Sequence, residues 1–207
     1  MKSDQQATIS GIDHIGINVP DIDAATTFLQ QAFGTKVIYE SYSKQQPPLE
    51  LAGIESTLNV APGTKIYACR MIKIGEGPTI ELFEVHVGGQ RDAIKSSDLG
   101  LQHFSVYTDN ISASIERFES AGGKILSRPN PILFLQEKGD NNFFCYGVTP
   151  WVLQLNLSPI LIRCPMKIIR RFAAGKVANQ LLQMPVKKNH TCNEFCKRSA
   201  YQLPGKY

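Results

Sequence analysis

The chain has 207 residues, of which 43% are hydrophobic, 19% charged and 9% aromatic, as in ordinary globular proteins. No stretch approaches the ~18 consecutive apolar residues of a membrane span, and the polar start of the chain lacks the apolar run of a secretory signal. Five scattered cysteines favour free thiols in a reducing cytoplasm over a disulfide scaffold.

The net charge of +4 is unevenly divided along the chain. Residues 1–158 contain 12 Lys and Arg against 17 Asp and Glu, whereas residues 159–207 contain 10 against one. Two regions of such opposite net charge are not expected to form one functional unit. We therefore expect an N-terminal tail at 1–9, a folded domain at 10–158 and a basic extension at 159–207.

A repeated segment organises the folded domain. The residues from Gly11 to Ala25 reappear 89 positions later from Gly100 to Ser114, with His14 and His103 at the same place in each copy. Each copy predicts an alternating strand, an Asp or Asn turn and a helix. Each helix is expected to end at glycine, at position 34 or at positions 122–123.

Further strands complete each half of the repeat. They are expected at 36–39, 49–60, 64–74 and 79–87, and then at 124–126, 132–136, 143–146 and 151–157. The unit is βαβββ, present twice, at about 11–88 and 100–158. The predicted fold class is therefore α+β, with paired βαβββ modules forming a cupped mixed sheet around a pocket.

Four polar positions are related by this repeat. His14 and His103 begin equivalent strands, Glu81 lies in the last strand of the first half, and Asn156 is its counterpart in the second. Pseudo-twofold symmetry would bring them together at the base of the cup. Two imidazoles and a carboxylate around an open position bind Zn²⁺, Fe²⁺, Mn²⁺ or Ni²⁺. The alternative is that each histidine is an ordinary hydrogen-bonded residue.

The same residues resemble a known superfamily. The matching segments are His14-Ile-Gly-Ile-Asn-Val-Pro-Asp-Ile, Ile80-Glu81-Leu, Leu101-Gln-His103-Phe-Ser-Val and Thr149-Pro-Trp-Val-Leu-Gln-Leu-Asn156-Leu. In this order they resemble the vicinal oxygen chelate superfamily, which includes glyoxalase I, epimerases, extradiol dioxygenases and bleomycin-resistance proteins. The resemblance implies a divalent metal held by His14, Glu81, His103 and Asn156.

The resemblance also implies the chemistry. In a glyoxalase-like or epimerase-like lyase or isomerase acting on a small vicinally oxygenated substrate, a proton next to a carbonyl is removed. Glu81 would have to leave the metal to act as the base, or a metal-bound hydroxide would serve. Asn156 stands where the family commonly has Glu and cannot take up a proton, which disfavours a two-carboxylate shuttle. One alternative is an extradiol dioxygenase using His14, Glu81 and His103. The other is a metal-free protein that sequesters its ligand.

Several further residues are candidates for the lining of the pocket. Candidates for substrate contact are Gln154, Phe28, Tyr67, Met71 and Phe104, with core packing as the alternative for the apolar ones. Glu84 and His86 are expected to face outward, Glu84 as a solvated or rim residue. The family usually has Asp-Pro-x-Gly before the last strand, where this chain has Thr149-Pro-Trp-Val152.

The extension 159–207 lies beyond the resemblance. A helix near Pro165 would place basic side chains beside apolar ones. It is either a solvated or core-docked helix, or a segment that contacts an anionic membrane or a nucleic acid. We expect a small-molecule substrate for the folded domain, a homodimer as a further arrangement, and a cytoplasmic location.

Overall fold

The computed structural model describes residues 9, 11–53, 55–132 and 142–159. The basic extension from residue 160 onward, with its predicted membrane or nucleic-acid contact, lies outside these residues. Most of the strand expected at 132–136 lies outside them as well.

The N-terminal module contains the first sheet. Its elements are β1 (His14–Val19), α1 (Ile22–Phe33), β2 (Lys36–Tyr42), β3 (Leu49–Glu50), α2 (Glu55–Leu58), β4 (Lys65–Lys73) and β5 (Thr79–His86). In the described residues the strand order is β1-β5-β4-β2, with β3 also on β4. β1 and β5 are parallel, and the other neighbours are antiparallel.

The C-terminal module repeats this plan. Its elements are β6 (Phe104–Thr108), α3 (Ile111–Ser120), β7 (Lys124–Ile125), β8 (Asn130–Pro131), β9 (Phe143–Val148) and β10 (Gln154–Pro159). The described strands are ordered β6-β10-β9-β7, with β8 on β9, and β6 runs parallel to β10. The α+β class and the two βαβββ modules are thereby confirmed.

One expected strand is wrong in most of its length. Residues 49–60 form only the short β3, a turn and the helix α2. Gly53 and Asn59 both have positive φ, at 86° and 53°, a conformation that an extended strand excludes. The apolar pattern of this segment therefore did not predict its backbone conformation.

The two main helices begin at the predicted Asp and Asn turns. The Asp21 carboxylate accepts hydrogen bonds from the backbone N–H groups of Asp23 and Ala24, and the Asn110 side chain accepts from Ala113. These contacts satisfy amides that the first helical turn leaves free. α1 ends at Gly34 in the left-handed conformation, with φ of 65°, as expected.

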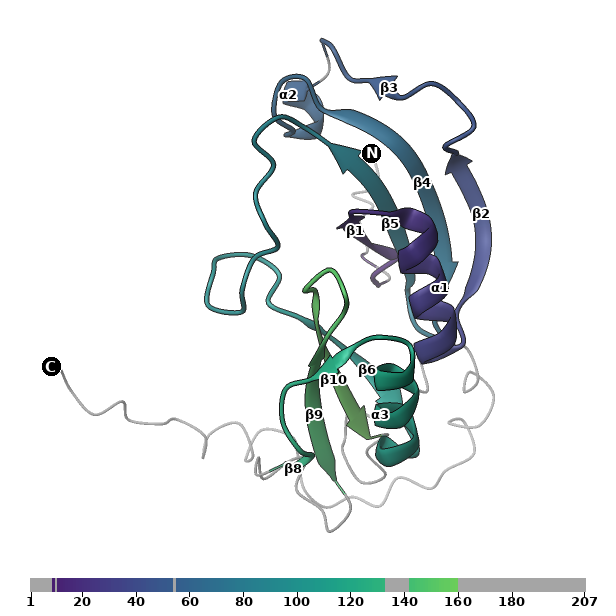
Figure 1. The fold of residues 1–207 in the computed structure, drawn as a ribbon, viewed down its shortest axis with the longest axis vertical. Helices are drawn as coiled ribbons and strands as arrows, with labels where there is room; N and C mark the ends of the chain where they lie inside the picture. Colours follow the sequence, from purple (N-terminus) through teal and green to yellow (C-terminus); the bar gives the residue numbers. More distant parts are fainter. Residues whose placement is uncertain (1–8, 10, 54, 133–141, 160–207) are drawn as a thin grey trace, which may run out of the picture.

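The two modules are joined on their helix sides. α1 packs against α3, and Figure 1 shows the two helices on one side of the molecule, with a separate sheet behind each. The rings of Phe28 and Phe118 meet edge to face with centroids 5.3 Å apart, and Trp151 packs on Phe28 at 5.4 Å. The hydrophobic core lies on this side of both sheets and continues from one module to the other. None of the described helices has the length and apolar character needed to cross a membrane.

Candidate functional site

Strand alternation gives each sheet a core-facing side and an opposite side on which none of the described helices packs, here called the helix-free face. On β1, Ile15, Ile17 and Val19 belong to the core or pack against it. His14 and Gly16 therefore lie on the helix-free face. Glu81 pairs with Gly16 across the parallel ladder, and so shares that face with His14.

His14 and Glu81 meet side chain to side chain. His14 Nε2 lies 3.4 Å from Glu81 Oε2, and His14 Nδ1 lies 2.8 Å from the Asp13 carboxylate. The hydrogen bond with Asp13 raises the pKa of His14, burial lowers it, and the nearby Glu81 charge raises it further, for a net increase. In the neutral imidazole, Nδ1–H donates to Asp13 and the Nε2 lone pair faces Glu81, the orientation a metal-ligating histidine needs.

Cys69 lies behind Glu81 on the neighbouring strand β4. Its sulfur is 3.3 Å from Glu81 Oε1, and its side chain is buried. Burial first, and then the adjacent Glu81 carboxylate, raise the pKa of the thiol to about 11. The group is therefore a protonated donor at neutral pH. From the sequence, Cys69 is expected to be a small apolar core residue; it is buried, but its contact with Glu81 depends on the register of β4 with β5.

The C-terminal module holds the equivalent pair in the same register. Asn156 pairs with Ser105, two residues after His103, just as Glu81 pairs with Gly16, two residues after His14. The predicted equivalence of Glu81 and Asn156 is thus visible in the ladders. The side chains differ, because Asn156 Oδ1 is buried with no hydrogen-bond partner among the described residues. His103 packs edge to face on Tyr146, with centroids 5.1 Å apart.

The described part of one chain does not assemble all four side chains. Among the described residues, no three His, Cys, Asp or Glu side chains form a group suited to a metal ion. The modules associate through α1 and α3, so each sheet keeps its own half of the predicted ligand set. His14 with Glu81 is one half-site, and His103 with Asn156 is the other.

The substrate candidates divide between the two sides of the sheets. Phe28 belongs to the core and Phe104 packs against it, so neither lies on the helix-free face. Met71 pairs with Glu81 and shares its face. Gln154 is hydrogen bonded to the Ser96 hydroxyl. Tyr67, at an irregularity of β4, packs its ring on His86.

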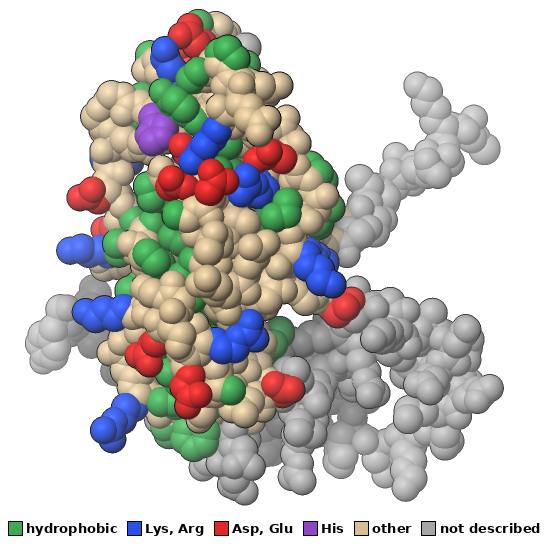
Figure 2. All heavy atoms as spheres, turned by 45° about the vertical axis from the view of Figure 1, so that its right-hand side comes forward, with side chains coloured by type: hydrophobic (Ala, Val, Ile, Leu, Met, Phe, Trp, Pro, Cys, Tyr) green, Lys and Arg blue, Asp and Glu red, His purple; other side chains and the backbone are tan. Residues whose placement is uncertain are grey.

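Glu84 is not the solvated residue that the sequence predicted. It is 7% exposed, and its Oε2 accepts a hydrogen bond from the Ile22 amide at 2.8 Å. The same oxygen lies 2.9 Å from Lys44 Nζ, which also contacts Asp21 and Asp23. Burial alone would lower the pKa of Lys44, but these three carboxylates together raise it. Figure 2 shows acidic and basic side chains intermixed on this module. Glu84 is buried at the start of α1, where its carboxylate accepts the hydrogen bond from the Ile22 amide.

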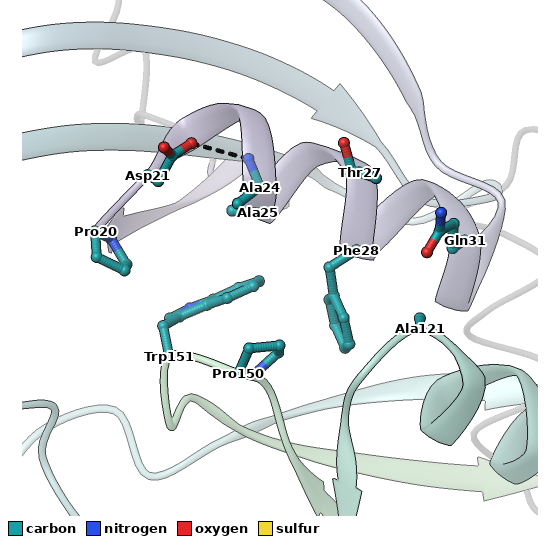
Figure 3. Close-up of a pocket in the computed structure, with 10 residues that line it drawn as sticks. All are labelled: Pro20, Asp21, Ala24, Ala25, Thr27, Phe28, Gln31, Ala121, Pro150 and Trp151. Carbon is teal, nitrogen blue, oxygen red and sulfur yellow. Dashed lines mark hydrogen bonds between the residues drawn. The ribbon is translucent and has the colours of Figure 1, made fainter.

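A cavity of about 400 Å³ lies on the helix side. Figure 3 shows it between α1 and the turn before β10, with Trp151, Pro150 and Phe28 around it. Trp151 Nε1 is buried there, and no described residue accepts a hydrogen bond from it. The His14–Glu81 pair does not line this cavity, so the candidate metal site and the cavity are separate features.

The donors in the N-terminal module fit a divalent metal. Two ligand atoms on one such ion, each about 2.1 Å from it, are about 3.0–3.4 Å apart, and the His14 and Glu81 atoms are 3.4 Å apart. The side chains of His14 and Glu81 are 42% and 22% exposed, which leaves the pair accessible. The orphaned Asn156 oxygen is a further neutral donor of the kind a metal accepts.

Comparison with known proteins supports the same fold. The chain is 27% identical over 149 residues to a 2-epi-5-epi-valiolone epimerase from Actinomyces sp., covering 70% of this chain and 77% of the relative. A glyoxalase family protein from Bacillus cereus superposes with a TM-score of 0.56 at 15% identity, covering 75% of this chain and 97% of that one. Glyoxalase I from Zea mays superposes with a TM-score of 0.50 at 18% identity, covering 71% of this chain and 43% of that one.

A sequence model of one family matches residues 13–146, from the start of the first repeat into β9. The matched segment contains His14, Glu81 and His103. The chain therefore belongs to the glyoxalase/bleomycin resistance protein/dioxygenase superfamily.

Proposed function

We propose that this protein is a divalent-metal-dependent epimerase of the glyoxalase type, acting on a small vicinally oxygenated substrate. The observation on which this depends is the approach of His14 Nε2 to Glu81 Oε2 at 3.4 Å, on a face that bears no helix. The superfamily and the epimerase relative support the reaction class. The metal would be Zn²⁺, Ni²⁺, Mn²⁺ or Fe²⁺, all of which accept imidazole and carboxylate ligands.

Glu81 is the proposed base. A metal held by His14 and Glu81 would supply Lewis-acid stabilisation of negative charge on a substrate oxygen. To act as base, Glu81 would have to leave the metal; its carboxylate would then take the proton from the carbon next to a carbonyl, and the C–H electron pair would move toward the carbonyl oxygen. Epimerisation then requires proton return on the opposite face of that carbon. Asn156 cannot supply this proton, and His103 is a proposed metal ligand, so water in the site would have to return it.

We further propose that a second copy of the chain completes the site. β1 and β6 are edge strands of their sheets in the described residues. Ile12 and Leu101, each two residues before a histidine of the repeat, are 70% and 52% exposed. Exposed apolar groups beside unpaired strand edges favour association. A homodimer would place His103 and Asn156 of the partner copy against His14 and Glu81.

The reaction is tested with 2-epi-5-epi-valiolone, the compound in the relative's name, in D₂O with each of the four metals. We expect deuterium to enter the epimerised product, and we expect His14→Ala and Glu81→Gln to abolish the incorporation. Conversion without deuterium incorporation would argue against proton abstraction. Oxygen uptake with a catechol would instead indicate the dioxygenase, and tight binding of an unchanged ligand by metal-free protein would indicate sequestration.

The shared site is tested by mixing two inactive variants. In a His14→Ala and His103→Ala heterodimer, one composite site carries both changes and the other carries neither. Mixing should therefore restore metal binding and activity to a fraction of the protein. If mixing restores nothing while the subunits exchange, the two half-sites are not shared between copies.

A further inference from the structure

The two carboxylate oxygens of Glu81 have different neighbours. Oε2 faces His14 Nε2 at 3.4 Å, whereas Oε1 lies 3.3 Å from Cys69 Sγ. Cys69 sits on β4 opposite Phe83, two residues beyond Glu81 on the same face of β5. The contact is therefore a diagonal cross-strand pair, fixed by the register of two strands.

The Cys69 thiol can act toward Glu81 only as a hydrogen-bond donor. An ionised carboxylate has acceptor oxygens and no proton, and a thiol is a weak S–H donor. Cys69 is 6% exposed, so water has little access to the thiol and competes little with Glu81 for its hydrogen bond. Cys69, His14 and Glu81 do not form a three-ligand metal group within the described residues. The sulfur thus contacts the carboxylate oxygen that does not face His14, and it is not placed to bind the same metal ion as His14.

The described residues of the C-terminal module show no equivalent contact. Asn156 pairs with Tyr146 on β9, so Phe144, two residues earlier, holds the place of Cys69. A phenyl ring offers no donor of this kind, and Asn156 Oδ1 has no hydrogen-bond partner within the part of the chain that the structure describes. Among the described residues, the thiol donor is therefore found beside the carboxylate and not beside the amide.

We propose that Cys69 is a positioning residue for Glu81, and this proposal rests on the metal-dependent function proposed above. The terminal torsion of a glutamate side chain is broad and roughly two-fold, so an unheld carboxylate turns easily. The Cys69 thiol donates to Oε1, limits this rotation and leaves Oε2 directed to the metal position beside His14. Groups that orient a ligand in this way alter metal affinity without touching the ion.

The proposal is tested by titrating Zn²⁺ into metal-free full-length variants in a calorimeter. Cys69→Ala removes the donor, and we expect about tenfold weaker Zn²⁺ affinity, at the low end for loss of such a partner because a thiol is a weak donor. Cys69→Ser keeps a donor, so its affinity should be closer to that of the parent than to that of Cys69→Ala. The visible absorption of bound Co²⁺ should change in Cys69→Ala and be largely restored in Cys69→Ser.

Cys145→Ala is the matched control. Cys145 is also a buried free cysteine, but its sulfur faces the Ser127 carbonyl in the other module. We expect Cys145→Ala to leave Zn²⁺ affinity unchanged, and circular dichroism verifies that each variant is folded. Parental affinity in folded Cys69→Ala, or equal losses in Cys69→Ala and Cys69→Ser, would overturn the positioning role.

His14→Ala separates this proposal from the proposed function. If His14→Ala binds Zn²⁺ as tightly as the parent, the metal site itself is misplaced and the proposed function fails. If His14→Ala loses Zn²⁺ while Cys69→Ala retains it, the metal site stands and only the role of Cys69 is rejected.

Discussion

The two modules share one backbone plan but differ in their polar residues. In both, the histidine and the last-strand polar residue hold the same register. In the N-terminal module the carboxylate of Glu81 has an imidazole on one oxygen and a thiol on the other. In the C-terminal module the amide oxygen of Asn156 has no hydrogen-bond partner among residues 9, 11–53, 55–132 and 142–159. Duplication thus preserved the positions, while the acid–base group and its support are present in one copy.

The helices differ in a similar way. α1 buries six residues, whereas α3 buries only Phe118. The Phe118 ring lies so close to the backbone of Gly123 and Gly147 that an added Cβ would come within 2.3 Å and 2.7 Å of it. Phe118 is therefore the one fully buried side chain of α3, beside the hydrogen bonds from Arg117 to the Gln31 carbonyl of α1.

The largest expected effect follows from this difference. Phe118→Ala should lower the free energy of unfolding by about 3–5 kcal/mol, because it removes a fully buried ring from the junction of the modules. Urea denaturation monitored by circular dichroism measures the change. Leu126→Ala, at a side chain that is 49% exposed, is the control and should have little effect. A loss below 1 kcal/mol in Phe118→Ala would show that α3 has another anchor.

Glu84→Ala tests the buried cap of α1. In the register of the repeat, the position equivalent to Glu84 in the C-terminal module is Pro159, whose side chain cannot accept a hydrogen bond. The change leaves the Ile22 amide and Lys44 without their shared acceptor. We expect a loss of about 2–3 kcal/mol, as for hydrogen bonds to a charged group, measured by the same denaturation. Glu116→Ala, at an exposed acid on α3, should change stability by less than about 0.5 kcal/mol.

Asn156→Glu makes the two modules more alike. A second carboxylate is a stronger ligand for a divalent metal than an amide oxygen, so Zn²⁺ affinity should rise about tenfold, equivalent to about 1.4 kcal/mol. Without metal, the same change should lower the thermal midpoint, because it places a charge where Asn156 Oδ1 is buried. Asn156→Gln lengthens the side chain without adding charge and is the control. Unchanged affinity in Asn156→Glu would place residue 156 away from the metal.

Val152→Gly should give the smallest effect, and a favourable one. Val152 has φ of 68°, a left-handed conformation that a β-branched residue adopts at a cost. Its side chain is 55% exposed, so little packing is lost on replacement. We expect a gain of about 1 kcal/mol in the free energy of unfolding. Val37→Gly, on the exposed side of β2, should be destabilising instead, and a loss in both would show that the turn is not strained.

The strand and helix pattern was largely predictable because the repeat supplied each element twice. The alignment of Gly11 and His14 with Gly100 and His103 identified the two copies. The helix caps at Asp21 and Gly34 follow from local backbone chemistry. The segment 49–60 was mispredicted because its turns depend on positive φ at Gly53 and Asn59. The burial of Glu84 depends on an amide 62 positions away in the chain, and strand alternation alone does not show such a partner.

By itself, the sequence determined the duplication, the strand faces and the equivalence of Glu81 with Asn156, because these depend on periodicity along the chain. Only the tertiary structure decided that the modules join through α1 and α3, and that Cys69 stands behind Glu81. Both depend on contacts between segments distant in sequence. Packing of apolar helix faces sets the first contact, and the register of antiparallel strands sets the second.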